Sequence, residues 1–196
     1  MRQLLLATRN QGKLHELQTI LAGVPFKVVS LAGMGHVPEI EETGESFLAN
    51  ARQKAIHFSR QSDALTLADD SGLEVRALGG VPGIRSARFG GAGLSDEDRC
   101  GLVLQQMAKI PWEERTARFV CALTLAQSGA AVRDFRGVVE GLIAFEPRGK
   151  NGFGYDPIFY YPPLARTFGE LPRAEKDTVS HRGLALAALK DYLEEI

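Results

Sequence analysis

A pair of aspartates that follows a short apolar run is the first candidate for a metal-binding or catalytic site. The run Leu65-Thr66-Leu67-Ala68 predicts a buried strand that ends at Asp69-Asp70-Ser71-Gly72. Carboxylates just beyond such a strand lie where open α/β sheets place their ligands. With the upstream Glu39, Glu41 and Glu42 they offer the oxygen donors that Mg²⁺ prefers, and a spare carboxylate can accept a proton from an attacking water. The alternative is a plain turn, because Asp, Ser and Gly favour turns.

A polar segment near the N-terminus is a candidate phosphate site, and it consists of Thr8, Arg9, Asn10, Gln11, Gly12 and Lys13. The free N–H groups and the positive dipole end of a helix N-terminus favour phosphate. Asn10 can cap this helix, and Lys13 adds a charge in its first turn. The segment is not a Walker A loop, because Leu14 follows Lys13 where that motif has Ser or Thr. A plain Asn N-cap with a solvated lysine is the alternative.

Two segments in the C-terminal part are further candidates for contact with a ligand. In Gly152-Phe153-Gly154-Tyr155-Asp156-Pro157, aromatic rings between glycines can lie flat against a base. Lys176 and Ser180-His181-Arg182 lie at the start of the last helical pattern, where Ser180 can cap the helix and His181 and Arg182 offer donors to carbonyl or phosphate oxygens. An aromatic-rich turn that caps a core is the alternative for the first segment, and a single histidine is weak evidence for the second.

The elements that must position these residues alternate between strand and helix in the first third of the chain. Strands are predicted at about 2–8, 26–31 and 65–68. Leucines at three- and four-residue spacing predict a helix after residue 10, and a second helix begins near Ser46. This order favours an α/β fold. The buried stripe of the second helix is predicted to consist of Phe47, Ala51, Ala55 and Phe58.

The rest of the chain predicts a long loop, a helix, a strand pair and a final helix. Glycines and prolines fill 79–93, which indicates a structured loop. Ser95 and Asp98 predict a capping box for a helix that runs to about Lys109. Period-two alternation from Ala117, followed by the turn at Gly129, predicts a hairpin with a second strand through Ile143. The last helix is predicted over 180–195, with Leu186, Leu189 and Leu193 on one face.

Composition excludes several classes of protein. The 196 residues contain 44% hydrophobic and 24% charged residues, which excludes a disordered chain, a collagen and a coiled coil. The net charge of −1 disfavours nucleic acid or an anionic membrane as a partner. No stretch approaches the ~20 apolar residues of a membrane helix. Cys100 and Cys121 have no metal-binding spacing, so a reduced, cytoplasmic protein is expected, with both cysteines as packing residues.

Taken together and in order, these segments resemble the Ham1-like family of inosine/xanthosine triphosphate pyrophosphatases over nearly the whole chain. Each matching string is short, and the ordered set is specific. The strings are Ala7-Thr8-Arg9-Asn10…Lys13, Glu41-Glu42-Thr43-Gly44, Asn50-Ala51…Lys54, Ala68-Asp69-Asp70-Ser71-Gly72-Leu73, Pro82-Gly83-Ile84…Ser86-Ala87-Arg88, Phe153-Gly154-Tyr155-Asp156-Pro157 and Ser180-His181-Arg182.

The resemblance implies an Mg²⁺-dependent hydrolase that cleaves dITP, ITP and XTP to the monophosphate and pyrophosphate and so cleanses the nucleotide pool. It implies a single domain over 1–196 with an elongated, two-lobed α/β fold, helices around a central mixed sheet, a deep cleft between the lobes, and a homodimer. Asp70 would be the general base and a metal ligand, with Glu41 as a further ligand, although the motif leaves the choice between Glu41 and Glu42 open. The triphosphate would be held by Thr8, Arg9, Asn10, Gln11, Gly12, Lys13 and Lys54. The substrate would also be touched by Ser71. The base would be surrounded by Phe153, Gly154, Tyr155, Asp156, Lys176, His181 and Arg182.

The chemistry of the base is compatible with this expectation. Hypoxanthine and xanthine carry a 6-keto oxygen where adenine has an amino group. Donors such as His181 and Arg182 suit a keto acceptor and would face the N–H₂ of adenine unpaired, and a hydrogen-bonding site rejects such a mismatch strongly.

Two rival functions remain at this stage. A Maf-like pyrophosphatase would also have an α/β fold, use Mg²⁺ and bind phosphate, but it would favour dTTP, UTP or modified pyrimidines. A nucleotide-sensing module would bind ITP with Mg²⁺ and release no product, although the intact Asp69-Asp70 pair argues against it.

Overall fold

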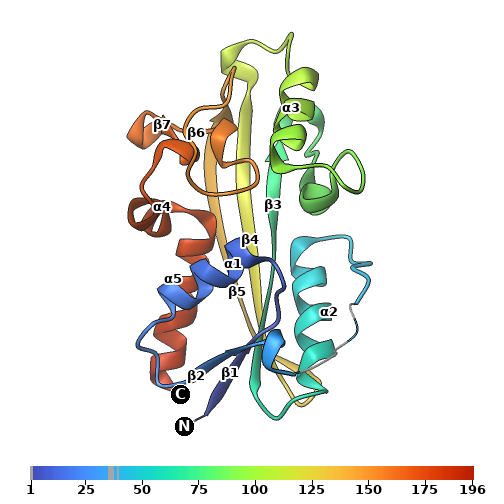
Figure 1. Cartoon of the computed structure of the whole chain (residues 1–196), viewed down its shortest axis with the longest axis vertical. Helices are drawn as coiled ribbons and strands as arrows, with labels where there is room; N and C mark the ends of the chain where they lie inside the picture. Colours follow the sequence, from blue (N-terminus) through green and yellow to red (C-terminus); the bar gives the residue numbers. More distant parts are fainter. Residues whose placement is uncertain (1, 35–37, 39) are drawn as a thin grey trace. The chain divides into compact units, whose positions relative to one another are not determined.

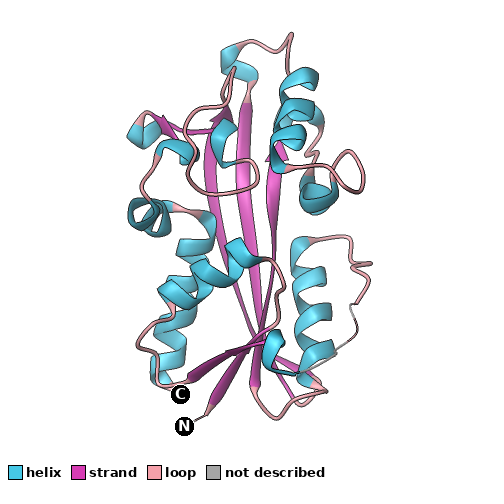
Figure 2. Cartoon of the chain, viewed as in Figure 1, coloured by secondary structure: helices cyan, strands magenta, loops and turns pink. Residues whose placement is uncertain are grey.

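The computed structural model describes residues 2–34, 38 and 40–196. Within this part of the chain, the α-helices are α1 (Gln11–Ile20), α2 (Phe47–Ser59), α3 (Asp96–Gln106), α4 (Arg173–Val179) and α5 (His181–Glu195). Figure 2 shows the helices in cyan and the strands in magenta. The strands are β1 (Gln3–Leu6), β2 (Lys27–Ser30), β3 (Leu65–Val75), β4 (Thr116–Gln127), β5 (Ala130–Ile143), β6 (Phe159–Tyr161) and β7 (Arg166–Thr167). Glu39 and His36 lie outside the described residues.

The described strands form one mixed sheet in the order β2-β1-β3-β4-β5-β6-β7. β1 pairs in parallel with β2 and with β3, whereas β6 pairs antiparallel with β5 and with β7. The expected α/β class with a mixed sheet is therefore confirmed. A deep cleft between two lobes stays a prediction.

Side-chain caps explain where three helices begin. The side chain of Asn10 accepts a hydrogen bond from the backbone N–H of Lys13 at the start of α1, and Ser46 does the same for Ala49 at the start of α2. Ser95 and Asp98 form the expected reciprocal capping box at α3. Each cap satisfies backbone donors that a helix start leaves without an intrahelical partner.

The chain contains two compact units. The first comprises the described residues of Met1–Asp70, Cys121–Gly137 and Arg182–Ile196, and the second comprises Ser71–Val120 and Val138–His181. A single domain over 1–196 stays a prediction. Each unit is described by itself below.

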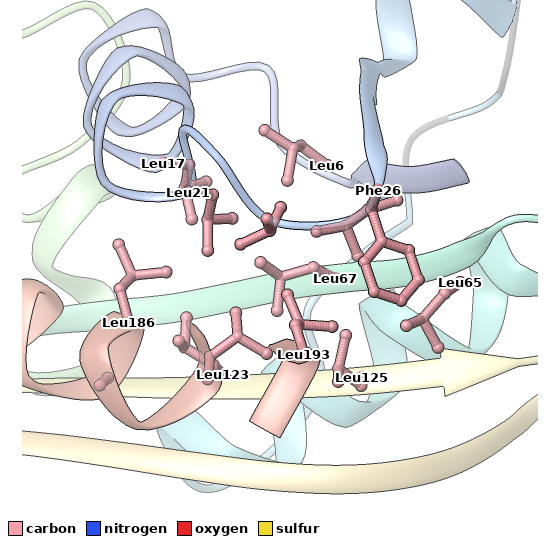
Figure 3. Close-up of a cluster of buried hydrophobic side chains, with 14 of the residues drawn as sticks. Leu6, Leu17, Leu21, Phe26, Leu65, Leu67, Leu123, Leu125, Leu186 and Leu193 are labelled. Atoms are coloured by element: carbon pink, nitrogen blue, oxygen red, sulfur yellow. The ribbon is translucent and has the colours of Figure 1, made fainter. Parts of the chain in front are cut away.

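In the first unit, helices cover both faces of the sheet. Leu4 and Leu6 of β1 belong to the core under α1 and α5, whereas Leu5 lies in the core under α2, because successive strand residues point to opposite faces. Figure 1 shows α2 on one side of the strands and α1 with α5 on the other. Figure 3 shows the larger cluster, in which leucines of β3 and β4 meet those of α1 and α5.

The core of the second unit is built largely from aromatic side chains. Phe119 of β4 contacts Phe159 of β6, with 4.5 Å between ring centroids, and stacks on Phe168 at 5.9 Å. Val103 of α3 and Met107, the residue that follows α3, are fully buried in the same cluster. Arg115 is buried as well, and its guanidinium donates to the carbonyls of Ile143, Met107, Ile110 and Ala144.

The largest correction concerns β3. The sequence predicted that this strand ends at Asp69-Asp70-Ser71-Gly72, but it continues to Val75, so the aspartates lie inside the strand rather than beyond its carboxyl edge. A strand tolerates buried carboxylates only where cations and hydrogen-bond donors surround them, and these come from other elements. The α3 helix ends at Gln106 rather than near Lys109, and α4, β6 and β7 were not predicted. Among the described residues, no helix is long and apolar enough to cross a membrane.

Candidate functional site

The loop between β1 and α1 is a preorganised helix entrance. Thr8 Oγ1 accepts a hydrogen bond from the N–H of Asn10 at 3.3 Å, and Asn10 Oδ1 accepts from the N–H of Lys13 at 3.0 Å. Arg9 and Gln11 are exposed, whereas Gly12 is half-buried. The predicted cap is thus present at the start of a ten-residue helix, and its positive dipole end favours an anion.

Asp69 is surrounded by cations. Lys13 Nζ lies 2.7 Å from Asp69 Oδ2, and Arg182 Nη2 lies 3.6 Å from the same oxygen. Arg182, on the first turn of α5, also pairs with Glu16 of α1. Burial by itself would raise the pKa of Asp69, but the charges of Lys13, Arg182 and Lys54 hold that pKa well below its usual range. Asp69 is therefore an ionised residue that holds α1 and α5 to the middle of β3.

The adjacent Asp70 has the opposite electrostatic character. Asn50 Nδ2 donates to Asp70 Oδ2 at 3.0 Å, and Lys54 Nζ lies 3.6 Å from Asp70 Oδ1. Burial raises the pKa of Asp70 despite the opposing charges of Lys54 and Lys13, and the negative charge of Glu42 adds to this rise. Two neighbouring carboxylates with pKa values shifted in opposite directions are typical of catalytic sites in which one stays ionised and the other takes part in proton transfer.

Lys54 connects Asp70 with the acidic loop before α2. Its Nζ lies 2.6 Å from Glu42 Oε1, so a single ammonium is close to the carboxylates of Glu42 and Asp70. Glu41 is exposed, whereas Glu42 is half-buried. In the part of the chain that the structure describes, no three or more His, Cys, Asp or Glu side chains form a metal-binding group. The candidate metal ligands are therefore the carboxylates of Glu42 and Asp70, which both lie close to the ammonium of Lys54.

The second unit contains a buried ion pair at the predicted aromatic segment. Lys176 Nζ of α4 lies 2.6 Å from Asp156 Oδ2, and both side chains are almost fully buried. The same oxygen accepts from the N–H of Phe153 at 2.9 Å, and Lys176 Nζ lies 4.9 Å from the centroid of the Phe153 ring. Gly152 has a φ of +76°, and a Cβ there would lie 2.0 Å from Asp156 Oδ2, so this turn requires glycine.

Two more predicted residues have defined contacts within the second unit. The imidazole of His181 stacks on Phe119, with 4.6 Å between centroids and 10° between planes. Tyr155 is buried, and its hydroxyl donates to the carbonyl of Ser86 at 2.8 Å. Ser71 lies on β3 and is half-buried. These contacts give the side chains defined orientations within their own unit.

The structure thus distributes the predicted site residues over two groups. The first unit contains Thr8, Arg9, Asn10, Gln11, Gly12, Lys13, Glu41, Lys54, Asp70 and Arg182, and the second contains Ser71, Phe153, Gly154, Tyr155, Asp156, Lys176 and His181. That one substrate contacts both groups stays a prediction. Arg182 was expected beside the base, and its contacts in the first unit are to Glu16 and Asp69.

Three residues of this arrangement carry no assigned role in the sequence analysis. The sequence pattern gives Asp69 no role separate from that of Asp70, and it assigns no site role to Glu16 or Asn50. A signal for Glu16 was its spacing, because it stands three residues after Lys13 on the same helix face. Asn50 stands within the apolar stripe of α2, where a polar side chain needs a buried partner.

Comparisons with known proteins agree with the ordered motifs. The model of the Ham1 family matches residues 4–192. The chain belongs to the Ham1 family. A relative from Geobacter sulfurreducens, named dITP/XTP pyrophosphatase, is 46% identical over 98% of this chain and 97% of its own length. A dITP/XTP pyrophosphatase of Exiguobacterium sibiricum is also 46% identical, over 98% of this chain and 100% of its own length.

Solved structures of the family have the same fold. The Ham1 protein from Coxiella burnetii is 43% identical, covers 100% of both chains and has a TM-score of 0.92. The Staphylococcus aureus Ham1 protein is 36% identical, covers 99% of both chains and has a TM-score of 0.89. The membership of the Ham1 family and the enzyme class expected from the motifs are confirmed.

Proposed function

We propose that this chain hydrolyses dITP, ITP and XTP to the nucleoside monophosphate and pyrophosphate. The observation that carries the proposal is the arrangement around the aspartate pair, in which Lys13 Nζ lies 2.7 Å from Asp69 and Asn50 Nδ2 donates to Asp70 at 3.0 Å. The opposite directions in which the pKa values of Asp69 and Asp70 are shifted support the same division of roles. A polyphosphate hydrolase needs fixed charges to place the substrate and a carboxylate that can take a proton. The names of the full-length relatives support the same substrate class.

The α1 entrance is proposed to hold the polyphosphate. Thr8 to Lys13 combine free backbone donors, a helix dipole and an ammonium in one segment, and Lys54 adds a second ammonium. A triphosphate carries about four negative charges, which such groups offset. The ion pairs that Lys13 and Lys54 form with Asp69 and Asp70 keep these ammonium groups in place beside the two aspartates.

Mg²⁺ fits the donor set around Lys54. Two carboxylates close to one ammonium are hard oxygen donors that already share a cation, and Mg²⁺ is commonly held by one or two carboxylates plus phosphates. Asp70 and one glutamate of the 41–42 pair would hold the ion, which when bound neutralises phosphate charge and polarises the phosphorus. Asp70 is the proposed general base and accepts the proton of the attacking water at a carboxylate oxygen.

The second group is proposed to recognise the base. The ring of Phe153 offers a stacking face, and Asp156 fixes the ammonium of Lys176 beside it. His181 of this group is proposed to supply a donor for the 6-keto oxygen of hypoxanthine or xanthine, for which the amino group of adenine is a mismatch. Arg182, which belongs to the first group, is proposed as a further donor to the same oxygen. Ser71 is proposed to touch the substrate from β3.

A cytoplasmic homodimer is part of the same proposal. The resemblance to the family suggests the dimer, and two free buried cysteines suit a reducing compartment. Sedimentation equilibrium of the purified chain tests the dimer, and a mass of one chain at all concentrations would contradict it.

The experiment that tests the function is steady-state kinetics with Mg²⁺ on dITP, ITP, XTP, GTP, ATP, dTTP and UTP, with each product identified. We expect the highest kcat/KM on dITP, ITP and XTP, with pyrophosphate as the product. A preference for dTTP or UTP would favour a Maf-like activity, and binding of ITP without turnover would favour a sensing module. Release of single phosphates would contradict the proposed bond cleavage.

A further inference from the structure

One face of α2 holds the acidic loop that precedes it. Asn50 Oδ1 accepts a hydrogen bond from the N–H of Gly44 at 2.8 Å, and Lys54 Nζ lies 2.6 Å from Glu42. Asn50 and Lys54 are one turn apart in the helix, so their side chains share a face. Figure 1 shows that the segment before α2 runs back alongside the helix.

Gln53 completes this face. Its Oε1 accepts from the N–H of Thr43 at 3.2 Å, and its Nε2 donates to Thr43 Oγ1 at 3.1 Å. Helix positions 50, 53 and 54 therefore contact loop positions 44, 43 and 42, so consecutive loop residues are held in antiparallel order. We call Asn50, Gln53 and Lys54 the loop-holding face.

Asn50 also connects the loop to Asp70. Its side chain is fully buried, and its Nδ2 donates to Asp70 Oδ2 at 3.0 Å while its Oδ1 accepts from Gly44. The amide has only one productive orientation, because a flipped amide would direct its NH₂ at an N–H and its oxygen at a carboxylate. The Asn50 amide therefore sets the distance between the backbone of Gly44 and the carboxylate of Asp70.

The loop approaches this face too closely for a side chain. A Cβ at Gly44 would lie 2.6 Å from Asn50 Oδ1 and 2.8 Å from Ala49 Cβ. Contacts under 3.0 Å force a displacement of one partner. Glycine at position 44 thus allows the backbone hydrogen bond to Asn50, and the loop path depends on the face that it contacts.

We propose that Asn50 and Gln53 are positioning residues that hold the Glu41–Glu42 carboxylates at coordinating distance from Asp70 for the divalent cation. This inference rests on the proposed function, in which Asp70 and a glutamate of this loop share that ion. Neither residue needs to touch the substrate. Partners that orient metal ligands typically change metal affinity by about 10- to 100-fold when they are removed.

The test compares Gln53→Met, which keeps the length of the side chain and removes both hydrogen bonds to Thr43, with the control Gln105→Met at an exposed position of α3. The first readout is hydrogen exchange of individual amides by NMR. The second is binding of Mn²⁺, as a spectroscopic probe of the Mg²⁺ site, measured by electron paramagnetic resonance on the full chain. Neither readout depends on turnover.

We expect Gln53→Met to accelerate exchange at the Thr43 amide and to weaken Mn²⁺ binding by about tenfold or more, with Gln105→Met unchanged in both. Unchanged exchange at Thr43, or faster exchange with unchanged Mn²⁺ affinity, would overturn the proposal. A wild-type chain that binds no Mn²⁺ would overturn it too. If the wild type binds Mn²⁺ but does not hydrolyse dITP, ITP or XTP, the proposed function is wrong. The effect of Gln53→Met on amide exchange and on Mn²⁺ affinity still decides whether Gln53 is a positioning residue.

Asn50→Leu provides a kinetic test of the buried member of the face. If Asn50→Leu is unfolded at the assay temperature, the comparison of Gln53→Met with Gln105→Met decides the proposal. In a folded variant we expect kcat on ITP to fall by about 10- to 100-fold, as for loss of a partner that orients a metal ligand. The KM should change by less than about threefold, because the helix entrance at α1 is untouched. A rise in KM with unchanged kcat would contradict a positioning role.

Discussion

Lys13 Nζ lies 2.7 Å from Asp69 Oδ2, so the first turn of α1 is tied to the interior of β3. The contact places the predicted phosphate-binding helix start next to the aspartate pair. It also explains how a strand can contain two consecutive buried carboxylates, because each has cationic or amide partners from a helix.

The variant Asp70→Asn tests the proposed general base. We expect kcat on ITP to fall by about 10²- to 10⁴-fold, the usual contribution of a positioned base, while nucleotide affinity stays close to that of the wild type. Asp63→Asn, the same change at an exposed site, serves as the control. Steady-state kinetics and nucleotide binding by calorimetry provide the measurement. Near-normal turnover of Asp70→Asn would remove Asp70 from the base role.

The variant Arg182→Ala tests the buried charge network. Its loss leaves Glu16 and Asp69 without their guanidinium partner, and breaking a buried pair costs about 3–5 kcal/mol in the free energy of unfolding. Arg166→Ala breaks a half-exposed pair with Glu175 and should cost less than about 1 kcal/mol. Urea denaturation measures both values. Equal losses in the two variants would show that the Arg182 network contributes no special stability.

Arg182 also has a predicted role in base recognition. In whatever fraction of Arg182→Ala folds, we expect the ratio of kcat/KM for ITP to that for ATP to fall more than the affinity for pyrophosphate. The reason is that a donor to the 6-keto oxygen discriminates bases without binding phosphate. An unchanged ratio, measured on the folded fraction at a temperature well below its Tm, would reject the assignment.

Asp134 gives a pH-dependent contribution to stability. Burial opposes the shift, but hydrogen bonds from Arg52 and Thr124 lower the pKa of Asp134 below its ordinary value of 3.8. A depressed carboxyl pKa stabilises the fold above the ordinary value, and this contribution is lost as the pH falls through the folded-state pKa. We therefore expect Asp134→Asn to lower the Tm at pH 7, and the difference from the wild type to shrink below about pH 4. A difference that stays constant from pH 7 to pH 3 would contradict this linkage.

The two cysteines are predicted to be chemically inert in the folded chain. Burial raises the pKa of Cys100 and of Cys121 to about 12, so neither is a thiolate at neutral pH. Iodoacetamide at pH 7.5 should leave both unmodified until guanidinium unfolds the protein, as judged by mass spectrometry. Ala131→Cys, which adds a thiol at an exposed position, provides the reactive control. Modification of Cys100 or Cys121 at the rate of the control would contradict their burial.

Elements with local signals were predictable from the sequence. The caps at Asn10 and Ser95, the helix start near Ser46 and the leucine stripe of α5 all depend on neighbours within a few residues, and the structure confirms them. α4, β6 and β7 are short and have no comparable periodicity, so their conformation depends on packing against the rest of the second unit. The true end of β3 was missed for the same reason, because partners distant in sequence outweigh the turn preference of Asp, Ser and Gly.

The amino-acid sequence by itself determined the fold class, the starts of α1, α2, α3 and α5, and the ordered motifs that identify the Ham1 family, because each is a pattern of residue types along the chain. Only the tertiary structure decided which charges meet. It paired Lys13 with Asp69, Lys54 with Glu42 and Arg182 with Glu16, and it directed the Asn50 amide to Asp70. The physical reason is that a carboxylate's pKa and partners depend on burial and on charges a few ångströms away, and the fold alone brings such charges together.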